Sequence, residues 1–253
     1  MTSSNLTQPD LSIVIPAYRE EKRIGKSLDK LSAFLRSNTF FKAKGIEVLV
    51  ISANTPESTN NIVKNKVRQF RHLELHTLRT RVGKGRDVQY GMLHASGKYI
   101  VFMDADLATP LVHLEDFYKI SEQGNDVVIA TRNLHTYRAN STRRSVSIIG
   151  NVLFRLFGGV WVEDSQCGFK MFNNTAAKLC FSKLEIMGWG FDMEILAIAK
   201  ANGLKIKASR VNDWEDQPNS TFTDTVIVTS IRSLKDLLHI LGNRLRNKYL
   251  DAG

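Results

Sequence analysis

The sequence predicts an α/β fold, with one domain built on a mostly parallel sheet that is flanked by helices. Two observations support this prediction. Short apolar runs rich in β-branched residues alternate with longer stretches in which apolar residues recur at helical spacing. The 253 residues also include only five prolines and no Gly/Ser-rich stretch that would indicate a linker between domains.

The strands are expected where apolar runs of strand length meet turn residues. The first run ends in a proline, and the run Tyr99–Met103 leads directly into acidic residues. The predicted strands are, in chain order, Leu11–Pro16, Ile46–Ile51, Leu73–Leu78, Tyr99–Met103, Asp126–Thr131, Gly168–Phe172 and Leu204–Val211.

The helices are expected where apolar residues recur every three or four positions. In the first, Ile24, Leu28, Leu31 and Leu35 share one face, and lysine and arginine occupy the other. The predicted helices are Glu20–Arg36, Ser58–Phe70, Lys84–Ala95, Leu114–Ser121, Ser145–Phe157, Asp192–Ala201 and Val226–Tyr249. In a sheet of this kind ligands bind at the carboxyl ends of the strands, so functional residues are expected there.

The charge of the chain favours negatively charged partners. The formal net charge is +10, from 35 Lys+Arg and 25 Asp+Glu, which suits nucleic acid, an anionic membrane or a phosphorylated substrate. The two cysteines form no CxxC pair, and zinc is therefore not expected. The start of the chain has no apolar core of a signal peptide, and the apolar runs are far shorter than the ~18 residues of a spanning helix. We expect a cytoplasmic protein.

The first chemical signal is Asp104-Ala105-Asp106, directly after a buried strand. Two carboxylates at the carboxyl edge of a sheet share a small region with little solvent. Hard divalent cations such as Mg²⁺ and Mn²⁺ take oxygen ligands of this kind and bridge them to substrate phosphates. The pair predicts a site for Mg²⁺ or Mn²⁺ that neutralises a diphosphate leaving group. A lone DxD is also common as two solvated loop residues.

Several further motifs stand in order along the chain. They are LSIVIPAYRE at Leu11–Glu20, Gly83-Lys84-Gly85, ASGKYIVFMDAD at Ala95–Asp106, DSQCGFK at Asp164–Lys170 and GWGFDME at Gly188–Glu194. This ordered set resembles glycosyltransferase family 2, which has the GT-A fold, and within it the polyprenyl-phosphate hexose transferases. The resemblance extends from about Leu11 to Ser220.

The resemblance implies a binding site for a nucleotide-sugar donor. Asp104 and Asp106 match the metal motif of the family, with Asp106 as the more direct ligand. Lys84 lies at a glycine-rich helix start, which favours an anion, although a solvated helix start is an equal alternative. The residues expected to contact the donor are Pro16, Tyr18, Glu20, Ser52, Lys84, Asp104 and Ala105.

One departure from the family concerns the base of the nucleotide. The family has an Asp-Asp-Gly-Ser-like turn after its second strand, and the first Asp helps to read the base. Here the turn is Ser52-Ala53-Asn54-Thr55, so a hydroxyl replaces a charged acceptor. Ala108 also replaces a glutamine of the mannose synthases and favours the glucosyltransferase branch.

The resemblance also implies catalytic and acceptor-side residues. The expected catalytic residues are Asp106, Asp192 and Arg132, and Arg132 is expected to meet the substrate phosphates. Asp192 begins a helix, where a carboxylate is also favourable as a cap. The residues expected on the acceptor side are Arg143, Asp164, Gln166 and Lys170.

The family resemblance implies that residues 11–225 form the GT-A catalytic domain, after a polar tail at 1–10 and before a basic amphipathic helix at 226–253. That helix carries leucines and basic residues along its length. Two interpretations remain open for it. It can lie in a membrane interface as a peripheral contact on the inner face of a membrane, or it can pack on the domain with a solvated basic face.

The resemblance implies the inverting transfer of a hexose from a nucleotide-diphospho-sugar, of the UDP-glucose or GDP-mannose type, to a polyprenyl or dolichyl phosphate. A lipid phosphate is already largely ionised at neutral pH, since its second pKa is ~6, and needs cations to position it. A sugar hydroxyl of a glycan or glycolipid is the alternative acceptor and needs a base, for which Asp192 is the candidate.

Three other function classes agree less well with the sequence. A non-catalytic nucleotide-sugar-binding protein remains an alternative, motivated by Ser52. A sugar-nucleotide pyrophosphorylase is disfavoured because Ile15–Glu21 is not glycine-rich. Nucleic acid is not an expected partner, because the basic residues are not interleaved with an aromatic stacking surface.

Overall fold

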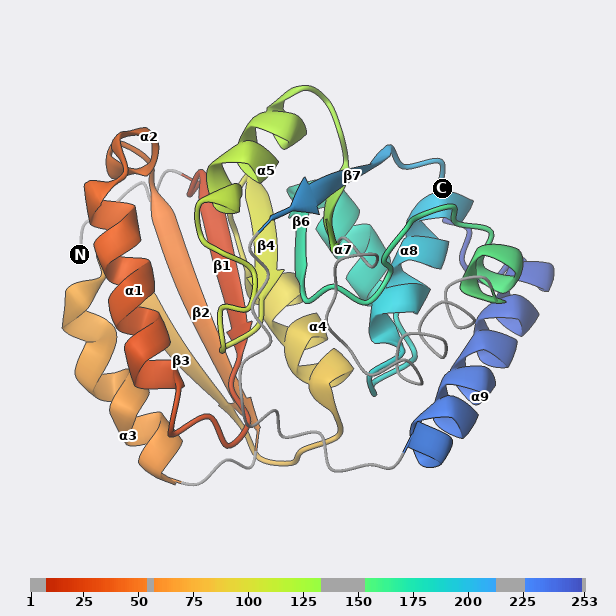
Figure 1. The fold of residues 1–253 in the computed structure, drawn as a ribbon, viewed down its shortest axis with the longest axis horizontal. Helices are drawn as coiled ribbons and strands as arrows, with labels where there is room; N and C mark the ends of the chain where they lie inside the picture. Colours follow the sequence, from red (N-terminus) through yellow and green to blue (C-terminus); the bar gives the residue numbers. More distant parts are fainter. Residues whose placement is uncertain (1–7, 54–56, 133–152, 213–225, 252–253) are drawn as a thin grey trace, which may run out of the picture.

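A seven-stranded sheet with the order β3-β2-β1-β4-β6-β5-β7 forms the centre of the molecule (Figure 1). The computed structural model describes residues 8–53, 57–132, 153–212 and 226–251. The strands are β1 (Leu11–Pro16), β2 (Ile46–Ala53), β3 (Leu73–Leu78), β4 (Tyr99–Met103), β5 (Val127–Arg132), β6 (Phe169–Asn173) and β7 (Ile206–Val211).

The sheet is parallel except at one strand. β6 runs antiparallel to both of its neighbours, β4 and β5, whereas the other strand pairs are parallel. In the register between β4 and β6, Met103 stands opposite Phe169. The end of β4 therefore lies beside the beginning of β6, which brings Asp104 next to Gly168. The predicted mostly parallel α/β sheet is confirmed.

Helices cover both faces of the sheet, and alternate residues of each central strand enter different layers. The helices are α1 (Ile24–Ser37), α2 (Thr39–Lys42), α3 (Glu57–Lys66), α4 (Lys84–His94), α5 (His113–Glu122), α7 (Asn174–Ser182), α8 (Phe191–Ala201) and α9 (Val226–Leu245). Residues 153–158 are also helical, and a short 3₁₀ helix spans Val67–Gln69.

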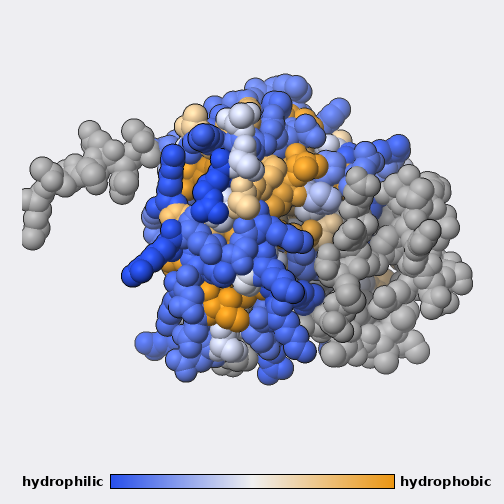
Figure 2. Space-filling model, turned by 60° about the vertical axis from the view of Figure 1, so that its left-hand side comes forward, coloured by the Kyte–Doolittle hydropathy of each residue, from blue (hydrophilic) through white to orange (hydrophobic). Residues whose placement is uncertain are grey.

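Two apolar clusters fill the space between sheet and helices. On β1, Ile13 and Ile15 belong to the cluster shared with α1, α3 and α5, and Val14 to the cluster shared with α4, α7 and α8. Figure 1 shows α1 and α3 at one end of the molecule and α9 at the other. Figure 2, in which the α1–α3 side comes forward, shows a mainly hydrophilic surface with a few small hydrophobic areas.

The predicted elements agree closely with the structure where it describes them. The bounds of β1, β3 and β4 are those expected, and the other strands differ by at most two residues at either end. α1 begins at Ile24 rather than at Glu20, because the chain turns there and Arg19 has a φ of 55°. α2 and α7 were not predicted. Of the expected helix at 145–157, residues 145–152 lie outside the described part.

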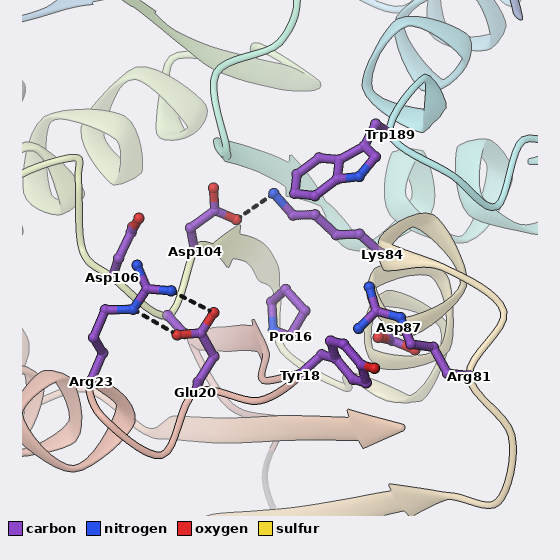
Figure 3. Close-up of a pocket in the computed structure, with 11 residues that line it drawn as sticks. Pro16, Tyr18, Glu20, Arg23, Arg81, Lys84, Asp87, Asp104, Asp106 and Trp189 are labelled. Atoms are coloured by element: carbon purple, nitrogen blue, oxygen red, sulfur yellow. Dashed lines mark hydrogen bonds and ion pairs between the residues drawn. The ribbon is translucent and has the colours of Figure 1, made fainter. Parts of the chain in front are cut away.

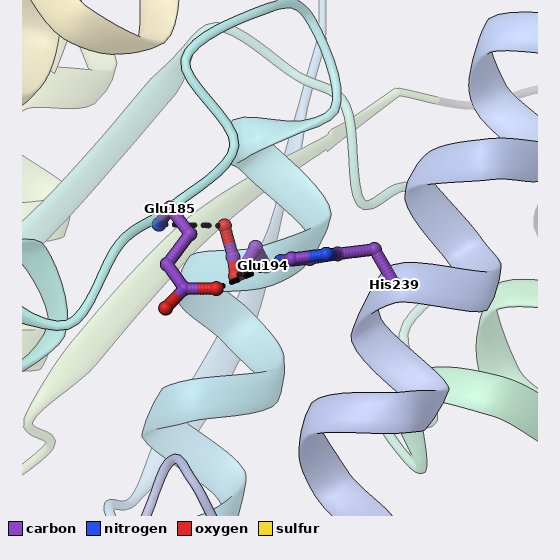
Figure 4. Close-up of side chains that lie close together, drawn as sticks. All are labelled: Glu185, Glu194 and His239. Carbon is purple, nitrogen blue, oxygen red and sulfur yellow. Dashed lines mark hydrogen bonds and ion pairs between the residues drawn. The ribbon is translucent and has the colours of Figure 1, made fainter.

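The final helix packs on the domain through polar as well as apolar contacts. Leu237 and Ile240 of α9 are buried in the core. Figure 4 shows His239 of α9 beside Glu194 of α8 and Glu185 of the preceding loop. The Glu194 carboxylate accepts hydrogen bonds from the backbone N–H groups of Glu185 and Ile186 and from the hydroxyl of Tyr249. These groups attach α9 to α8.

The helices that the structure describes include none of the length and hydropathy needed to cross a membrane.

Candidate functional site

A cavity of about 280 Å³ opens at the carboxyl ends of β1 and β4, beside the first turn of α4. Most of its lining comes from three segments: the loop after β1, the start of α4 with the residue Arg81 before it, and the turn after β4. Its lining residues are Pro16, Tyr18, Glu20, Arg23, Arg81, Lys84, Asp87, Asp104, Ala105, Asp106 and Trp189. This position is the one expected for a ligand site in a sheet of this type.

The cavity has two chemically different ends (Figure 3). At one end, called the DAD end, lie Glu20, Arg23, Asp104 and Asp106. At the other, called the Arg81 end, lie Tyr18, Arg81 and Asp87. Pro16 lies between them, and the Lys84 side chain extends toward Asp104.

At the DAD end, Asp104 is held between a lysine and a glycine. The Lys84 Nζ atom lies 2.6 Å from Asp104 Oδ1, and the lysine side chain is only 13% exposed. Burial alone would lower the pKa of Lys84, but the carboxylates of Asp104 and Asp192 outweigh this and raise it. Lys84 therefore stays a cation at this edge of the sheet.

The other carboxylates of the DAD end are destabilised as anions. Burial raises the pKa of Asp106, and the charge of Asp104 raises it further. Burial likewise raises the pKa of Glu20, although Arg23, whose Nε lies 2.9 Å from Glu20 Oε2, lowers it. Three carboxylates, those of Glu20, Asp104 and Asp106, face one cavity, and such a site favours added positive charge.

The backbone is strained on both sides of the DAD end. Arg19, between Tyr18 and Glu20, has a φ of 55°, and Leu107, directly after Asp106, has a φ of 53°. Residues other than glycine rarely adopt this left-handed backbone conformation, and each residue that does so costs about 1–3 kcal/mol. The two turns direct Glu20 and Asp106 into the cavity, and the Ala108 N–H donates to Asp106 Oδ1 at 3.0 Å.

Two glycines allow the start of α4 to lie against the loop before α8. A Cβ atom at Gly83 would stand 2.2 Å from the Met187 carbonyl oxygen, and one at Gly85 would stand 2.7 Å from that of Ile186. This approach brings Trp189 to the cavity, where the Lys84 Nζ lies 5.0 Å from its ring centre.

The family of the chain follows from a match over most of the domain just described. The family model described as "Glycosyl transferase family 2" matches residues 12–180, which contain the sheet from β1 to β6 and all lining residues except Trp189.

The chain belongs to glycosyl transferase family 2.

Curated relatives agree with this membership. A dolichyl-phosphate beta-glucosyltransferase of Trichomonas vaginalis is 31% identical over 238 residues, covering 91% of this chain and 72% of the relative. A dolichyl-phosphate beta-glucosyltransferase of Drosophila melanogaster is 33% identical over 235 residues, covering 85% of this chain and 69% of the relative. The chain is therefore a glycosyltransferase.

Solved structures show that the fold is the GT-A fold. Glucosyl-3-phosphoglycerate synthase of Mycobacterium tuberculosis, solved with Mn²⁺, UDP and glucosyl-3-phosphoglycerate, has a TM-score of 0.64 at 17% identity, covering 92% of this chain and 80% of that one. A mannosyltransferase of Pyrobaculum calidifontis, solved with GDP-mannose and Mn²⁺, has a TM-score of 0.61 at 15% identity, covering 95% of this chain and 65% of that one.

In this glycosyltransferase the structure brings most of the residues predicted for the donor site into one cavity. They are Pro16, Tyr18, Glu20, Lys84, Asp104, Ala105 and Asp106. Ser52 is not among the lining residues: it is buried, and its hydroxyl donates to Asn60 Oδ1 at 2.7 Å. The role in base binding predicted for Ser52 remains a prediction.

Two predicted acceptor-side residues, Asp164 and Lys170, form ion pairs with the predicted catalytic residues Arg132 and Asp192, outside the cavity lining. The Arg132 guanidinium donates to Asp164 Oδ2 at 2.5 Å and to Oδ1 at 3.1 Å. The Lys170 ammonium is buried, contacts Asp192 and donates to the Cys167 carbonyl oxygen at 2.6 Å. Burial raises the pKa of Asp192, while Lys170 and Lys84 lower it.

The two remaining acceptor-side residues are Gln166 and Arg143. Gln166 is exposed, and its backbone N–H donates to Asp164 Oδ1 at 3.2 Å. Arg143 lies outside the described residues. The segment at 164–168 nevertheless borders the DAD end, because the Asp104 N–H donates to the Gly168 carbonyl oxygen at 3.2 Å. The roles predicted for these residues remain predictions.

Sequence reasoning missed four residues of the cavity, namely Arg23, Arg81, Asp87 and Trp189. Arg23 has no signal of its own in the sequence, where it is one of several basic residues in the predicted first helix. Asp87 had a signal, because it is an acid in the first turn of the helix opened by Gly83-Lys84-Gly85. Trp189 stands in the GWGFDME motif, but its approach to the cavity depends on packing that the sequence does not reveal.

Proposed function

We propose that this glycosyltransferase moves a hexose from a nucleotide-diphospho-sugar to a polyprenyl or dolichyl phosphate at a membrane surface. The donor is of the UDP-glucose or GDP-mannose type, and the reaction inverts the anomeric carbon. The observation that carries the donor half is the placement of Asp104, Asp106 and Lys84 around one cavity. The acceptor half rests on the curated relatives, which are dolichyl-phosphate beta-glucosyltransferases.

The DAD end fits a divalent cation. Asp104 and Asp106 offer hard oxygen ligands, burial and the Asp104 charge raise the pKa of Asp106 so that a cation beside it is favoured, and the absent side chain of Gly168 leaves room for the Asp104 carboxylate. We assign Asp104 and Asp106 as the residues that hold Mg²⁺ or Mn²⁺. A metal held there would supply positive charge that neutralises the diphosphate leaving group.

Lys84 and the start of α4 provide further positive charge for a diphosphate. The Lys84 ammonium stands at the start of α4, where backbone N–H groups and the helix dipole also favour an anion. A diphosphate bound at the DAD end, beside the Lys84 ammonium, would lie near this positive helix end. In the transfer step, an acceptor oxygen bonds to the anomeric carbon while the bond from that carbon to the diphosphate breaks, and the nucleoside diphosphate leaves with the electron pair.

The pairing of Asp192 supports a phosphate rather than a hydroxyl as acceptor. A sugar hydroxyl needs a carboxylate that is free to take its proton. Asp192 was the candidate, but it is buried, contacts the Lys170 ammonium and does not line the cavity. A lipid phosphate is largely ionised at neutral pH, with a second pKa of ~6, and needs no such base.

A transfer assay tests the proposal. The protein is incubated with Mn²⁺, labelled UDP-glucose or GDP-mannose and either dolichyl phosphate in detergent or an oligosaccharide with free hydroxyls. We expect label in the organic phase with dolichyl phosphate and one of the two donors, and none with Asp106→Asn. Label transferred only to the oligosaccharide, or to neither acceptor, would refute the proposed acceptor.

The surface of α9 supports peripheral contact with a membrane. Ile231, Leu234, Leu238 and Leu245 are exposed along one stripe of the helix, next to the buried face that holds Leu237 and Ile240. Exposed basic residues follow the other edge of the stripe at positions 232, 235 and 246. An apolar stripe bordered by basic residues is typical of a helix that lies in an anionic membrane interface.

A neighbouring segment enlarges this apolar surface. Arg244 of α9 donates to the Phe157 carbonyl oxygen at 2.5 Å, so residues 153–162 lie beside the helix. In that segment Leu156 is 60% exposed and Trp161 is 77% exposed. Tryptophan is favoured at membrane–water interfaces because its ring has an apolar body and a polar N–H.

Vesicle sedimentation tests this contact. We expect wild-type protein to sediment with vesicles of phosphatidylcholine and phosphatidylserine more than with phosphatidylcholine alone. The double variant Leu234→Ser/Leu238→Ser should stay in the supernatant. Val112→Ser is the control, because Val112 is an exposed apolar residue too but lies before α5. Equal sedimentation of the double variant and the control would refute the contact.

A further inference from the structure

At the Arg81 end, Asp87 has a side chain whose hydrogen bonding is incomplete. The residue is 1% exposed, and it is one of the residues that line the cavity. Its Oδ1 atom is buried and accepts no hydrogen bond from the residues that the structure describes. A buried carboxylate oxygen without a donor costs free energy unless a ligand supplies the donor.

Helix capping does not account for this carboxylate. Asp87 stands in the first turn of α4, where a negative charge is favourable, and capping would use the free N–H groups of that turn. The Asp87 backbone N–H donates to the Gly83 carbonyl oxygen, and Oδ1 takes no N–H of the turn. Arg86, the nearest basic residue in sequence, donates instead to Gln89 Oε1 at 2.8 Å.

Arg81 presents the complementary group. Its Nη1 atom is buried and has no hydrogen-bond acceptor within the described residues. Its guanidinium carbon lies 3.2 Å from the ring centre of Tyr18, so the group is stacked and held in the cavity. The Arg81 end therefore contains an acceptor, Asp87 Oδ1, and a donor, Arg81 Nη1, which attract each other as charges but have no hydrogen-bond partner among the described residues.

We propose that Asp87 and Arg81 read the base of the nucleotide donor at the Arg81 end of the cavity. This inference rests on the proposed function. The two side chains suit a base edge with a ring N–H beside a carbonyl oxygen, which uracil and guanine have. Cytosine and adenine present the reverse pattern, an amino group beside an unprotonated ring nitrogen. In the pose that suits uracil or guanine, the amino group would face the Arg81 donor and the bare ring nitrogen would face the Asp87 acceptor, so neither protein group would gain a partner, which is a basis for rejection.

The two ends of the cavity agree with this assignment. Asp104 and Asp106 lie at the DAD end, away from Tyr18, Arg81 and Asp87 (Figure 3). A nucleotide with its diphosphate at the DAD end can extend its base toward the Arg81 end. The hydroxyl of Ser52 is already used, since it donates to Asn60 Oδ1. Burial raises the pKa of Asp87 to about 6, so the carboxylate is largely ionised above neutral pH.

Titration calorimetry with UDP, GDP, CDP and ADP at fixed Mn²⁺ and pH 7.5 tests the inference. We expect the wild type to bind UDP or GDP at least about 10-fold more tightly than CDP and ADP. Asp87→Ala should weaken the preferred nucleotide about 10- to 100-fold, the effect of a hydrogen bond to a charged group, and leave CDP and ADP unchanged. Asp87→Asn, which keeps the shape of the side chain, should raise the affinity for CDP and ADP because its amide can also donate.

A control and the opposing outcomes separate this inference from the proposed function. Asp104→Asn should weaken all four nucleotides alike, because it acts at the diphosphate. If Asp87→Ala does the same, or if the wild type binds all four equally, the assignment of Asp87 is wrong and the nucleotide site stands. If the wild type binds none of them with Mn²⁺ present, both the inference and the proposed function are wrong.

Discussion

Gly168 lies so close to Asp104 that a Cβ atom added to the glycine would stand 2.1 Å from Asp104 Oδ2. The contact follows from the antiparallel register of β6 against β4, in which Phe169 faces Met103. The carboxylate lies between the Gly168 backbone and the Lys84 ammonium. The sheet itself therefore fixes the orientation of a proposed metal ligand.

The first prediction concerns this contact. Gly168→Ala should displace the Asp104 carboxylate and reduce Mn²⁺-dependent transfer about 10-fold or more, since small misplacements at a reacting centre have large effects. The measurement is the transfer rate as a function of Mn²⁺ concentration. Gly188→Ala is the control, because a Cβ atom there meets nothing within 4 Å. Equal activity of the two variants would show that the position of Asp104 does not matter.

The second prediction concerns Lys84. Replacing it with glutamine removes the cation 2.6 Å from Asp104 Oδ1 and should lower kcat/KM about 10- to 100-fold. The loss should appear at the ordinary assay concentration of Mn²⁺ and should persist in excess Mn²⁺, since the lysine acts beside the metal and not through it. Lys26→Gln, on the exposed face of α1, should behave as the wild type. An unchanged kcat/KM for Lys84→Gln would assign Lys84 a purely structural role.

The strands were predictable because each has a local signal at its end. β1 is a β-branched run that ends in Pro16, and β4 is an apolar run that ends at Asp104, so the pattern alone fixes their bounds. α7 has no comparable signal. Its sequence, NTAAKLCFS, is short and only weakly periodic, and it begins with the Asn173 side chain, which accepts from the Ala176 N–H.

The candidate site was predictable in part for the same reason. Pro16, Lys84 and Asp104 each follow a strand or open a helix, so local patterns place them at one sheet edge. Arg81, Asp87 and Trp189 enter the cavity through packing between distant segments, above all the approach of Gly83 and Gly85 to the loop before α8. The Lys170–Asp192 pair likewise depends on tertiary contacts.

The third prediction concerns stability and pH. Burial raises the pKa of Asp87 from 3.8 to about 6. The folded protein therefore binds this proton more tightly than the unfolded chain, and the wild type loses stability as the pH rises through this interval. Asp87→Asn cannot ionise, so its stability relative to the wild type should increase from pH 4 to pH 7, by at most about 3 kcal/mol.

Urea unfolding at a series of pH values measures this difference. Asp29→Asn is the control of opposite sign, because hydrogen bonding to Lys66 lowers the pKa of the exposed Asp29. Its carboxylate stabilises the fold above its unfolded pKa, and the variant should be slightly less stable than the wild type at neutral pH. A stability difference for Asp87→Asn that does not change with pH would contradict the raised pKa.

The fourth prediction concerns the attachment of α9. The Tyr249 hydroxyl donates to Glu194 Oε1 at 2.8 Å, and both residues are buried. Tyr249→Phe removes a donor from a buried carboxylate and should lower the free energy of unfolding by about 1–3 kcal/mol. Tyr90→Phe removes a half-buried hydroxyl that lies 3.5 Å from His76 and should change it by less than about 0.5 kcal/mol. Equal effects of the two variants would show that the Tyr249 hydroxyl does not help to hold α9 on the domain.

The claim at the centre of this account is that the cavity between β1, α4 and β4 is a metal-dependent nucleotide-sugar site. Thermal unfolding of the wild type and of Asp106→Asn, with UDP-glucose or GDP-mannose and either Mn²⁺ or EDTA, tests it most directly. A ligand that binds the folded state raises the Tm. The account predicts that one donor raises the Tm of the wild type only with Mn²⁺, and that Asp106→Asn shows no such rise. A rise that is the same in Asp106→Asn, or no rise with either donor, would contradict it.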